Sequence, residues 1–280
     1  MYWWLVVAAL AGNSVAQFNG EGTTYGPPDG ESPQGGNCAL MQWIDFAPKY
    51  HAALNNYQWN LGLHCGRCVQ AKCVDPACTS TESVVGQITD RCPECQTGDL
   101  DMSLPMFNKI TGLMTGRPKI SWQFVDCPVT GGLEICAKSG SSDFWLYVQP
   151  NNAINGVAKM SINGKSAPPF GSAWYFMSQA NGPLSSTEVS LTSFAGETIS
   201  TTVSLKADQC TQISQQFKGS GSAPGPAPVT PSTSAPTPAP TPAPTPAPTP
   251  APTPAPTPTP TPTPAPTPEP TPAPTPAPTP

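Results

Sequence analysis

The sequence has little charge and almost no histidine, and these shortages exclude several classes of function. Of its 280 residues 10% are charged, two are histidines, and the formal net charge is -5. It contains no run of Lys or Arg, so nucleic acid and an anionic membrane surface are poor partners. Beyond the first residues, no apolar stretch is long enough to span a bilayer. The body of the chain also has no Asn-x-Ser/Thr acceptor for N-linked glycans.

Proline, in contrast, is abundant and unevenly placed. Of the 40 prolines, 27 lie in residues 219–280, where Ala-Pro-Thr-Pro repeats and Glu269 is the one charged residue. Alternate prolines fix φ and remove backbone donors, which predicts an extended, disordered tail. This tail is either a solubilising segment or a tether to a wall, and its threonines are candidate O-glycan acceptors. The remaining body of about 200 residues suits two domains.

The first residues indicate export. An apolar stretch from Trp3 to Ala11 is too short for a membrane span, and the small residues Ser14-Val15-Ala16 precede Gln17. This pattern predicts a secretory signal peptide over residues 1–16, although it lacks an early Lys or Arg. The ten cysteines are an even number, which in a secreted chain favours five disulfides. We therefore expect a secreted, extracellular protein, with association to a cell wall as a further option.

The cysteine spacing also admits a metal site. Cys65 and Cys68, together with Cys92 and Cys95, form two C-x2-C pairs, which in a cytosolic chain would indicate zinc. The predicted export and the even cysteine count favour disulfides over metal. We therefore expect no metal and no cofactor. A redox role for Cys92 and Cys95 is a minor alternative, because closing so small a ring adds little stability.

Strand signals outnumber helix signals in the body. Asn163-Gly164 is the strongest hairpin-turn signal, and Asn155-Gly156 is a second candidate. The segment 126–132 is rich in turn-forming residues and is typical of a boundary between domains. The predicted strands are 84–89, 120–125, 143–149, 156–162 and 188–193, and the predicted helices are 44–57 and 105–113.

Five motifs follow one another in the first half of the body. They are Thr23-Thr24-Tyr25-Gly26, Gly35-Gly36-Asn37-Cys38-Ala39, Cys65-Gly66-Arg67-Cys68 continuing to Cys73, Ile88-Thr89-Asp90-Arg91-Cys92-Pro93, and Asp99-Leu100-Asp101-Met102-Ser103, with Cys127 closing the series. In this order and spacing the chain resembles the expansins, including microbial expansin-like proteins, over about Phe18 to Cys210.

The resemblance implies an all-β fold. Residues 17–129 would form a six-stranded double-psi β-barrel, and residues 130–218 an immunoglobulin-like, carbohydrate-binding β-sandwich, before the disordered tail over 219–280. Members of the family loosen cell walls without detectable hydrolysis. The expected partner is therefore a cell-wall polysaccharide (cellulose, glucan or xyloglucan), and the expected protein is a monomer that is not an enzyme.

The family's bridge pattern also implies a disulfide pairing. It implies three disulfides and leaves four cysteines, which would form two more. The last of these disulfides would brace the ends of the second domain. The implied pairs are Cys38 with Cys65, Cys68 with Cys127 and Cys73 with Cys78, leaving Cys92 with Cys95 and Cys136 with Cys210.

Three residues match the polar centre of the family's groove. They are Thr23, Asp90 and Asp101, and the family needs the last for activity. A carboxylate between Leu100 and Met102 is expected to be desolvated, which would raise its pKa and let it donate a hydrogen bond to a sugar. The alternatives are a carboxylate that binds backbone amides for Asp101, an ordinary strand residue for Thr23, and a turn cap for Asp90.

The chain departs from the family pattern near this centre. Asp99 replaces a histidine, and we expect it to be a solvated loop residue. Cys92 stands where bacterial members have a tyrosine, so one aromatic wall of the groove is expected to be missing. Tyr25, Tyr57 and Trp59 could supply aromatic surface instead, with burial the expected state of Trp59.

Hydrolysis is the main alternative. An inverting glycosidase needs an acid and a base. Asp101 matches the acid of the related family 45 endoglucanases, but their base follows the tyrosine of the first motif, and here Asp29 is displaced into a turn. Related lytic transglycosylases need one aspartate only, so that activity stays open. A barwin-like elicitor or inhibitor is a third alternative, against which the second domain argues.

The second domain shows a period of two around its first strand. Leu146 and Val148 fall on the expected core face, and Trp145 and Tyr147 on the other, where they could stack on sugar rings. The family displays three such aromatics. Phe144 and Trp145 match two of them, although alternation also allows Phe144 in the core. The candidates for the third are Trp174 and Tyr175.

Overall fold

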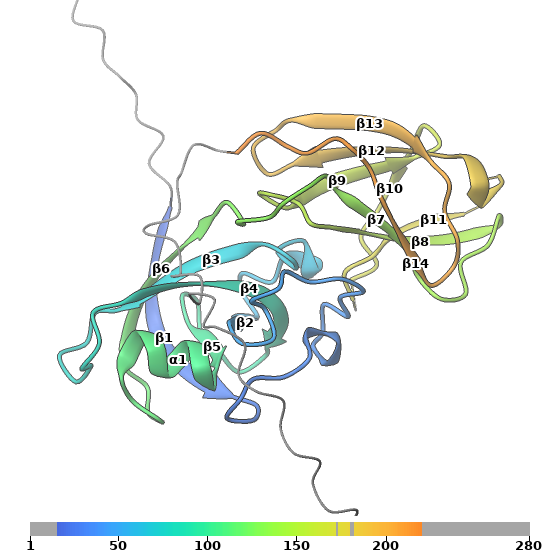
Figure 1. Cartoon of the computed structure of the whole chain (residues 1–280). Helices are drawn as coiled ribbons and strands as arrows, with labels where there is room; N and C mark the ends of the chain where they lie inside the picture. Colours follow the sequence, from blue (N-terminus) through green and yellow to red (C-terminus); the bar gives the residue numbers. More distant parts are fainter. Residues whose placement is uncertain (1–15, 172, 180–181, 220–280) are drawn as a thin grey trace, which may run out of the picture. The chain divides into compact units, whose positions relative to one another are not determined.

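The computed structural model describes residues 16–171, 173–179 and 182–219, all within one compact unit. The predicted tail, except its first residue, and the predicted signal peptide, except Ala16, lie outside the described residues. Within the described part of the chain, no helix is long and apolar enough to cross a membrane. The expected all-β architecture is confirmed (Figure 1).

The first six strands close into a barrel in the order β1-β5-β2-β4-β3-β6 (Figure 1). Strands β1 and β5 run parallel, as do β2 and β4, and the remaining neighbours are antiparallel. This agrees with the double-psi barrel that the resemblance implies. The strands are β1 (Gln17–Tyr25), β2 (His51–Asn55), β3 (Cys68–Cys73), β4 (Ser83–Cys92), β5 (Leu100–Ser103) and β6 (Lys119–Val125).

Alternate residues of these strands fill the barrel. Val84, Ile88 and Trp122 lie in its core with Leu100 and Met102, as the period of two predicts. Helix α1 (Leu104–Thr111) adds Met106, Phe107 and Ile110 to the same core, and it confirms the helix predicted over 105–113. Its ends follow the sequence: a proline stands in its first turn, and Gly112, at φ 73°, caps its end.

The helix predicted over 44–57 is wrong. Residues 45–50 form turns, in which the Tyr50 amide donates to the Phe46 carbonyl, and strand β2 follows. All five residues of β2 are buried because it lies between β4 and β5 with both faces covered. A strand buried on both faces shows no alternation, and its alanines and leucine favour a helix in isolation.

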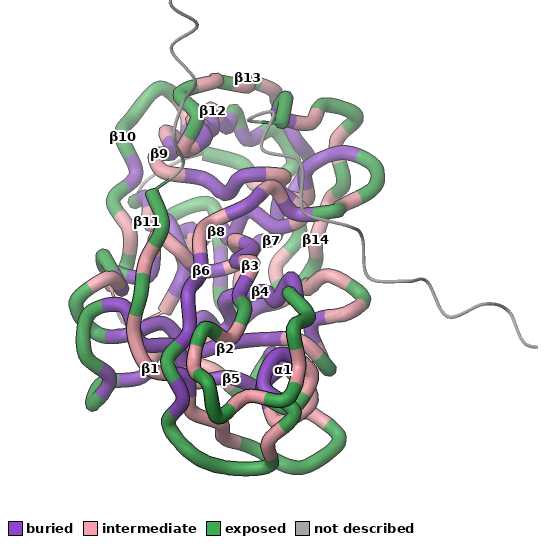
Figure 2. Tube along the Cα trace, turned by 90° about the vertical axis from the view of Figure 1, so that its left-hand side faces the viewer, coloured by how far each residue is buried: buried purple, intermediate pink, exposed green. Residues whose placement is uncertain are grey.

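The remaining strands form two four-stranded sheets, in the orders β10-β9-β12-β13 and β11-β8-β7-β14. One hydrophobic core lies between them, which confirms the expected sandwich. Figure 2 shows the buried residues gathered on strands and the connections mostly exposed. The strands are β7 (Glu134–Ala137), β8 (Trp145–Asn151), β9 (Val157–Ile162), β10 (Lys165–Ala167), β11 (Phe176–Gln179), β12 (Thr187–Ser193), β13 (Thr198–Val203) and β14 (Gln209–Gln212); the 3-10 turns are η1 (Pro33–Gly35), η2 (Asn60–Gly62) and η3 (Leu184–Ser186).

The two predicted turns have different outcomes. Asn163 and Gly164 join β9 to β10 with φ of 48° and 74°, as a tight hairpin requires, so this prediction is confirmed. Asn155 and Gly156 lie between β8 and β9, which belong to different sheets, so they do not form a hairpin turn. Their sequence signal is a local one, whereas the choice of sheet depends on the whole core.

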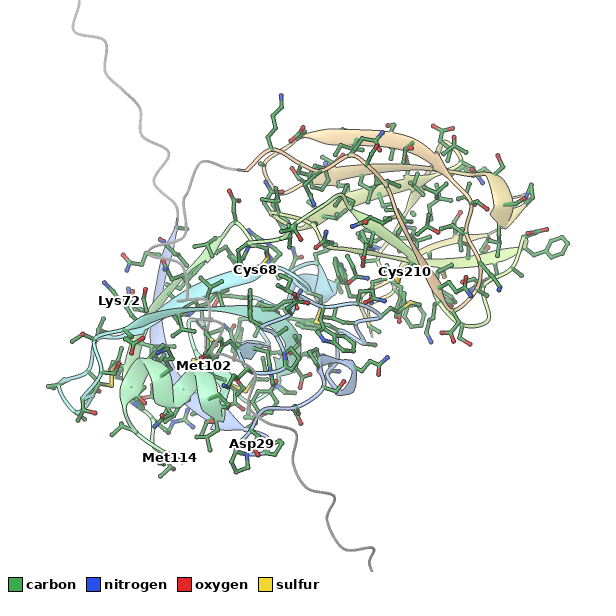
Figure 3. The ribbon with its side chains drawn as sticks, viewed as in Figure 1. Asp29, Cys68, Lys72, Met102, Met114 and Cys210 are labelled. Carbon is green, nitrogen blue, oxygen red and sulfur yellow. A yellow bond between two sulfur atoms is a disulfide. The ribbon has the colours of Figure 1, made fainter. Side chains whose placement is uncertain are left out.

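All ten cysteines are paired, and the pairing is the one that the resemblance implies. Because Cys65 and Cys68 belong to two different disulfides, the four sulfurs of the zinc alternative are not available as thiolates. Cys68 and Cys210 are labelled in Figure 3. The disulfides are Cys38–Cys65, Cys68–Cys127, Cys73–Cys78, Cys92–Cys95 and Cys136–Cys210.

Candidate functional site

Four strands of the barrel bring the three predicted polar residues into one cross-strand row. Thr23 on β1 lies opposite Asp101 on β5, Asp101 lies opposite Ala53 on β2, and Ala53 lies opposite Asp90 on β4. Side chains in direct register share a face, and neighbouring strands are about 4.8 Å apart. We call these four residues the polar row. Its two carboxylates are two strands apart, with only the methyl group of Ala53 between them.

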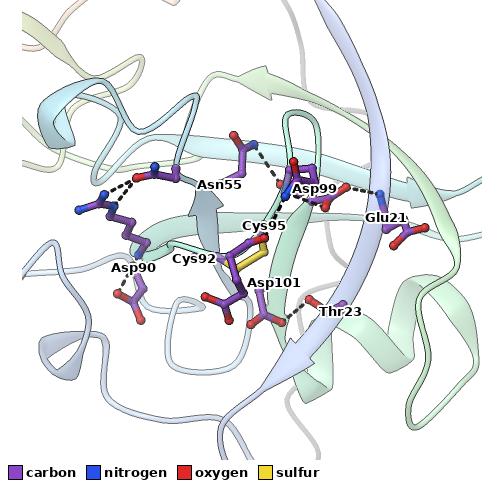
Figure 4. The surroundings of a disulfide bond; sticks show 12 residues. Glu21, Thr23, Asn55, Asp90, Cys92, Cys95, Asp99 and Asp101 are labelled. Atoms are coloured by element: carbon purple, nitrogen blue, oxygen red, sulfur yellow. Dashed lines mark hydrogen bonds between the residues drawn. A yellow bond between two sulfur atoms is a disulfide. The ribbon is translucent and has the colours of Figure 1, made fainter.

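Strand β5 places Asp101 on the outer face of the barrel. Leu100 and Met102 on either side point into the core and are fully buried. Because successive strand residues face opposite sides, the carboxylate between them points outward, toward Thr23 (Figure 4). The apolar neighbours that marked Asp101 in the sequence are therefore core residues, whereas Asp101 itself is partly exposed.

Thr23 and Asp101 form a short hydrogen bond. The Thr23 hydroxyl donates to Oδ1 of Asp101 at 2.6 Å (Figure 4). Burial raises the pKa of Asp101, the Thr23 hydrogen bond opposes this rise, and the charges of Glu94 and Asp90 add to it. A raised pKa widens the pH range in which the carboxyl keeps its proton, and a protonated carboxyl can donate a hydrogen bond to an oxygen of a ligand. The alternative in which Asp101 binds backbone amides is not what the described contacts show.

Asp90 is held by the backbone. Its Oδ1 accepts from the amides of Asn37 at 2.6 Å and Arg91 at 2.7 Å. This is the turn-capping arrangement expected as the alternative to a binding role. The two roles are compatible, because a carboxylate has two oxygens and the amides occupy only Oδ1.

Asp99 is buried, so the expected solvated loop aspartate is wrong. Its side chain is 6% exposed, Oδ1 accepts from the Glu21 amide at 2.7 Å, and Oδ2 accepts from the Gln96 amide at 2.9 Å (Figure 4). The segment before β5 folds back against the barrel, where the Trp122 indole donates to the Gly98 carbonyl at 2.7 Å. Asp99 therefore fixes the entry to β5 and, through it, the position of Asp101.

Tyr25 packs on the Cys92–Cys95 disulfide beside the polar row. Its partly buried ring contacts the cluster formed by Ala53, Cys92 and Cys95. It also meets the His51 ring edge-on, at 5.6 Å between centroids. Burial, followed by the charge of Asp90, raises the pKa of Tyr25, so its hydroxyl stays a neutral donor. Cys92 itself is buried, which means that the disulfide supports Tyr25 rather than replacing an aromatic wall.

The other aromatics expected near the groove separate into one exposed and one buried ring. Tyr57 is 66% exposed. Trp59 belongs to the barrel core, which confirms the prediction that it is buried. The exposed phenol is available to a ligand at the end of β2, which closes at Asn55. The indole of Trp59 is not.

The sandwich carries a second candidate surface, made of aromatic rings. Leu146 and Val148 are fully buried, and Trp145 and Tyr147 face outward, as the period of two predicts. The two outward rings meet edge-on at 5.7 Å. Phe144, just before β8, is 80% exposed, so its alternative placement in the core is wrong. Its backbone turns at Ser142 before the strand begins, which breaks the alternation that the sequence suggests.

Trp174 and Tyr175 are not surface aromatics, and both candidates for the third ring are wrong. Trp174 is 1% exposed and packs in the barrel core. Tyr175 is buried, and its hydroxyl donates to the Ala39 carbonyl at 3.0 Å. Between them the backbone is fixed by Gln149, whose amide donates to the Trp174 carbonyl at 3.0 Å. Both rings are used in packing, which a motif of two adjacent aromatics does not reveal.

The third exposed ring is that of Phe170, which the sequence analysis missed. It is 46% exposed and meets Tyr147 edge-on at 5.2 Å. The available signal was its place between Pro169 and Gly171, two residues typical of loops, which lie on the surface. Together, Phe144, Trp145, Tyr147 and Phe170 form what we call the aromatic surface.

Comparisons with known proteins give a domain model for part of the barrel and longer matches to expansins. A family model described as lytic transglycolase matches residues 51–122, from the start of β2 into β6. Expansin-B3 of Arabidopsis thaliana is 28% identical over 204 residues, which cover 64% of this chain and 76% of that protein. Expansin-YoaJ of Bacillus subtilis is 38% identical over 73 residues, covering 26% of this chain and 32% of that protein.

Solved structures share the fold. An expansin of Clavibacter michiganensis superimposes with a TM-score of 0.62 at 22% identity, covering 72% of this chain and 98% of that one. A variant of the same expansin, solved in complex with cellohexaose, gives a TM-score of 0.61 at 21% identity and the same coverage. The matches to Expansin-B3 and to the Clavibacter expansin cover 64% and 72% of this chain, so they are not confined to the barrel. The chain is similar to expansins over both the barrel and the sandwich.

Proposed function

We propose that this protein is secreted, binds a β-linked glucan of a cell wall and loosens it without cleaving it. The polar row carries this proposal: a carboxyl with a raised pKa and a threonine hydroxyl at 2.6 Å lie partly exposed on the outer face of the barrel. This pair offers a donor and an acceptor at one spot, as a sugar hydroxyl requires. Loosening then follows from competition, because each bond that a glucan makes to Asp101 replaces a bond to its neighbouring chain.

The aromatic surface supplies most of the binding in this proposal. Its exposed rings present apolar faces that match the faces of pyranose rings. The cellohexaose complex of the Clavibacter expansin supports a β-1,4-linked glucose chain as the ligand class. The binding surface and the polar row therefore have separate tasks: the first retains the polymer, and the second acts on its hydrogen bonds.

The candidate bases for hydrolysis are held by the backbone or displaced from Asp101 in this arrangement. An inverting glycosidase needs a second carboxylate about 6.5–9.5 Å from the acid, with access to water. Both carboxylate oxygens of Asp99 accept hydrogen bonds from backbone amides. In Asp90, one carboxylate oxygen, Oδ1, accepts from two backbone amides. Asp29, the residue nearest in sequence to the expected base, is exposed in a turn. We therefore propose that Asp101 acts as a hydrogen-bonding group and not as half of a catalytic pair.

A lytic transglycosylase is the second candidate, and the description of the matching family model favours it. Such an enzyme needs a single acid that protonates the leaving oxygen, and a carboxyl with a raised pKa is suited to that step. The substrate would be peptidoglycan instead of a glucan. The two candidates therefore differ in both polymer and product.

One experiment separates the candidates. The protein is incubated with cellulose-containing walls and with peptidoglycan, and polymer binding, wall creep under load and soluble products are measured in the same samples. We expect creep of the glucan wall without soluble sugars, and loss of creep in Asp101→Asn with binding retained. The exposed Asp45 gives the matched control Asp45→Asn, which should behave as the unmodified protein. Release of peptidoglycan fragments that disappears in Asp101→Asn would replace loosening by lytic cleavage.

A further inference from the structure

A polar pocket lies on the outer face of the barrel, at the other end of β1 from the polar row. Its volume is about 170 Å³. The residues that line it come from β1, β6, β3 and β4, and six of them are polar: Gln17, Gln70, Lys72, Ser83, Ser121 and Gln123. Thr23 lies six positions after Gln17 on β1, which places the pocket about 20 Å from the polar row at about 3.3 Å per residue.

Strand register explains why the amides gather there. Gln17 lies opposite Gln123, and Gln123 lies opposite Gln70, so three glutamines from three strands stand side by side on one face. The next row holds Ser121 opposite Lys72. Gln17 donates to the Ser121 hydroxyl at 2.6 Å and so fixes one side of the pocket. The side-chain amides of the other two glutamines make no hydrogen bond with any described residue.

The charge in the pocket is positive. Lys72 is the charged residue among those that line it, and it forms no salt bridge within the described part of the chain. The neighbouring cations differ: Lys119 and Arg117 are both paired with Glu21 at 2.7 Å, and Lys109 with Glu82 at 2.7 Å. In a protein of net charge -5, an unpaired ammonium group beside free amides is suited to an anionic ligand.

We propose that this pocket binds a sugar unit that carries a carboxylate. The ammonium group of Lys72 pairs with the carboxylate, while the amides of Gln70 and Gln123 donate to and accept from the ring hydroxyls (Figure 3 labels Lys72). The volume is below the 300–1,000 Å³ typical of larger ligands, so it suits one sugar ring at a time. No exposed aromatic ring lines it, since Trp122 is buried, so affinity depends on charge and amides.

Such a site would let the protein hold two polymers. An acidic polymer would occupy the pocket, while a neutral glucan occupies the aromatic surface and the polar row. The inference does not depend on the proposed function, because the pocket shares no residue with either of those surfaces. Free sugar carboxylates occur in uronic-acid polymers and, as muramic acid, in peptidoglycan strands from which the stem peptides have been removed, and both offer the charge that Lys72 requires.

The test is an NMR titration of the secreted protein. The probes are trigalacturonic acid, N-acetylmuramic acid and, as the neutral control, cellotriose. We expect one or both acids to shift the side-chain amide signals of Gln70 and Gln123, with cellotriose leaving them unchanged. The acid that shifts them at the lower concentration identifies the source of the ligand. Raising the salt concentration should weaken binding, because a single charge pair carries much of it.

Two lysine variants make the assignment specific. Lys72→Gln keeps the length of the side chain but removes its charge, and it should weaken acid binding at least fivefold. Lys165→Gln changes an exposed lysine on β10 of the sandwich and should leave binding unchanged. Binding that is equal in both variants, equal shifts by cellotriose, or no shift by either acid would overturn the proposal. Asp101→Asn should not affect these titrations, so their outcome is independent of that for wall loosening.

Discussion

The polar row of the barrel and the aromatic surface of the sandwich arise from the same strand period but have opposite physical character. In the row, a partly buried carboxyl gains its properties from desolvation and from one hydrogen bond to Thr23. On the aromatic surface, rings such as Phe144 and Phe170 gain theirs from exposure alone. Chemistry on a hydrogen-bonded polymer needs the first arrangement, and retention on a polymer needs the second.

The comparison extends to how each surface is supported. Around Asp101 the backbone is fixed by Asp99, which takes two amides, and by the disulfide under Tyr25. The aromatic surface has lighter support: Trp145 and Phe170 each meet Tyr147 edge-on, and Phe144 meets no other ring of the described residues. A geometry that must be held within a fraction of an ångström is thus built on rigid strands, whereas a stacking surface tolerates adjustment.

The largest effect should be on the free energy of unfolding, when a buried aromatic residue rather than an exposed one is replaced by alanine. Trp174→Ala removes a fully buried indole and should lower the free energy of unfolding by about 3–5 kcal/mol. Phe144→Ala, at the most exposed ring, should change it by less than about 0.5 kcal/mol. Chemical denaturation of both variants measures these values. Similar losses for the two would mean that exposure does not separate their roles.

Sequence reasoning reached the barrel residues more completely than the sandwich aromatics, for a physical reason. Thr23, Asp90 and Asp101 were found because fixed motifs place them on strands whose register follows from the family fold. Phe170 sits in a loop, and the burial of Trp174 depends on contacts with the distant barrel core, which no local pattern encodes.

The same limit applies to secondary structure. Alternation and β-branched residues identified β4, β6 and β8. Both signals are absent from β2, whose residues His-Ala-Ala-Leu-Asn are all buried. Asp99 was misplaced for a related reason: its two amide partners come from β1 and from its own loop, and only the folded chain brings them together.

The second prediction tests whether the row acts as a unit. Thr23→Val keeps the shape of the side chain but removes the hydroxyl that donates to Asp101. Losing a hydrogen bond to an ionisable partner costs about 1.5–3 kcal/mol, so wall creep should fall roughly tenfold or more. Thr24→Val is the matched control, because its hydroxyl is buried and has no hydrogen-bond partner among the described residues. Equal creep in both variants would show that the bond to Asp101 is not needed.

The third prediction assigns Phe170 to the aromatic surface. Phe170→Ala and Trp145→Ala should each weaken binding to insoluble cellulose by about 1–2 kcal/mol, because each removes one stacking ring. Met114→Ala, a change at an exposed apolar residue of the barrel, serves as the control and should not alter binding. Depletion isotherms give the affinities. If Phe170→Ala binds cellulose as the unmodified protein does, Phe170 does not belong to the aromatic surface.

The smallest effect should be a change in how the stability of the fold depends on pH. This test concerns only the barrel, where Asp101 lies. The pKa of Asp101 is raised in the folded state, chiefly by burial, so between the unfolded and folded pKa values the native protein binds more protons. Its contribution therefore falls as pH rises through that window and is least favourable above the folded pKa. Asp101→Asn removes this contribution, so the variant should gain stability relative to the unmodified protein as pH rises from about 4 to 7. Melting temperatures of both proteins across this range provide the measurement, with Asp45→Asn again as the exposed control. A difference that shrinks with rising pH would mean that Asp101 is charged and stabilised in the fold, and the hydrogen-bond donor proposed for loosening would be lost with it.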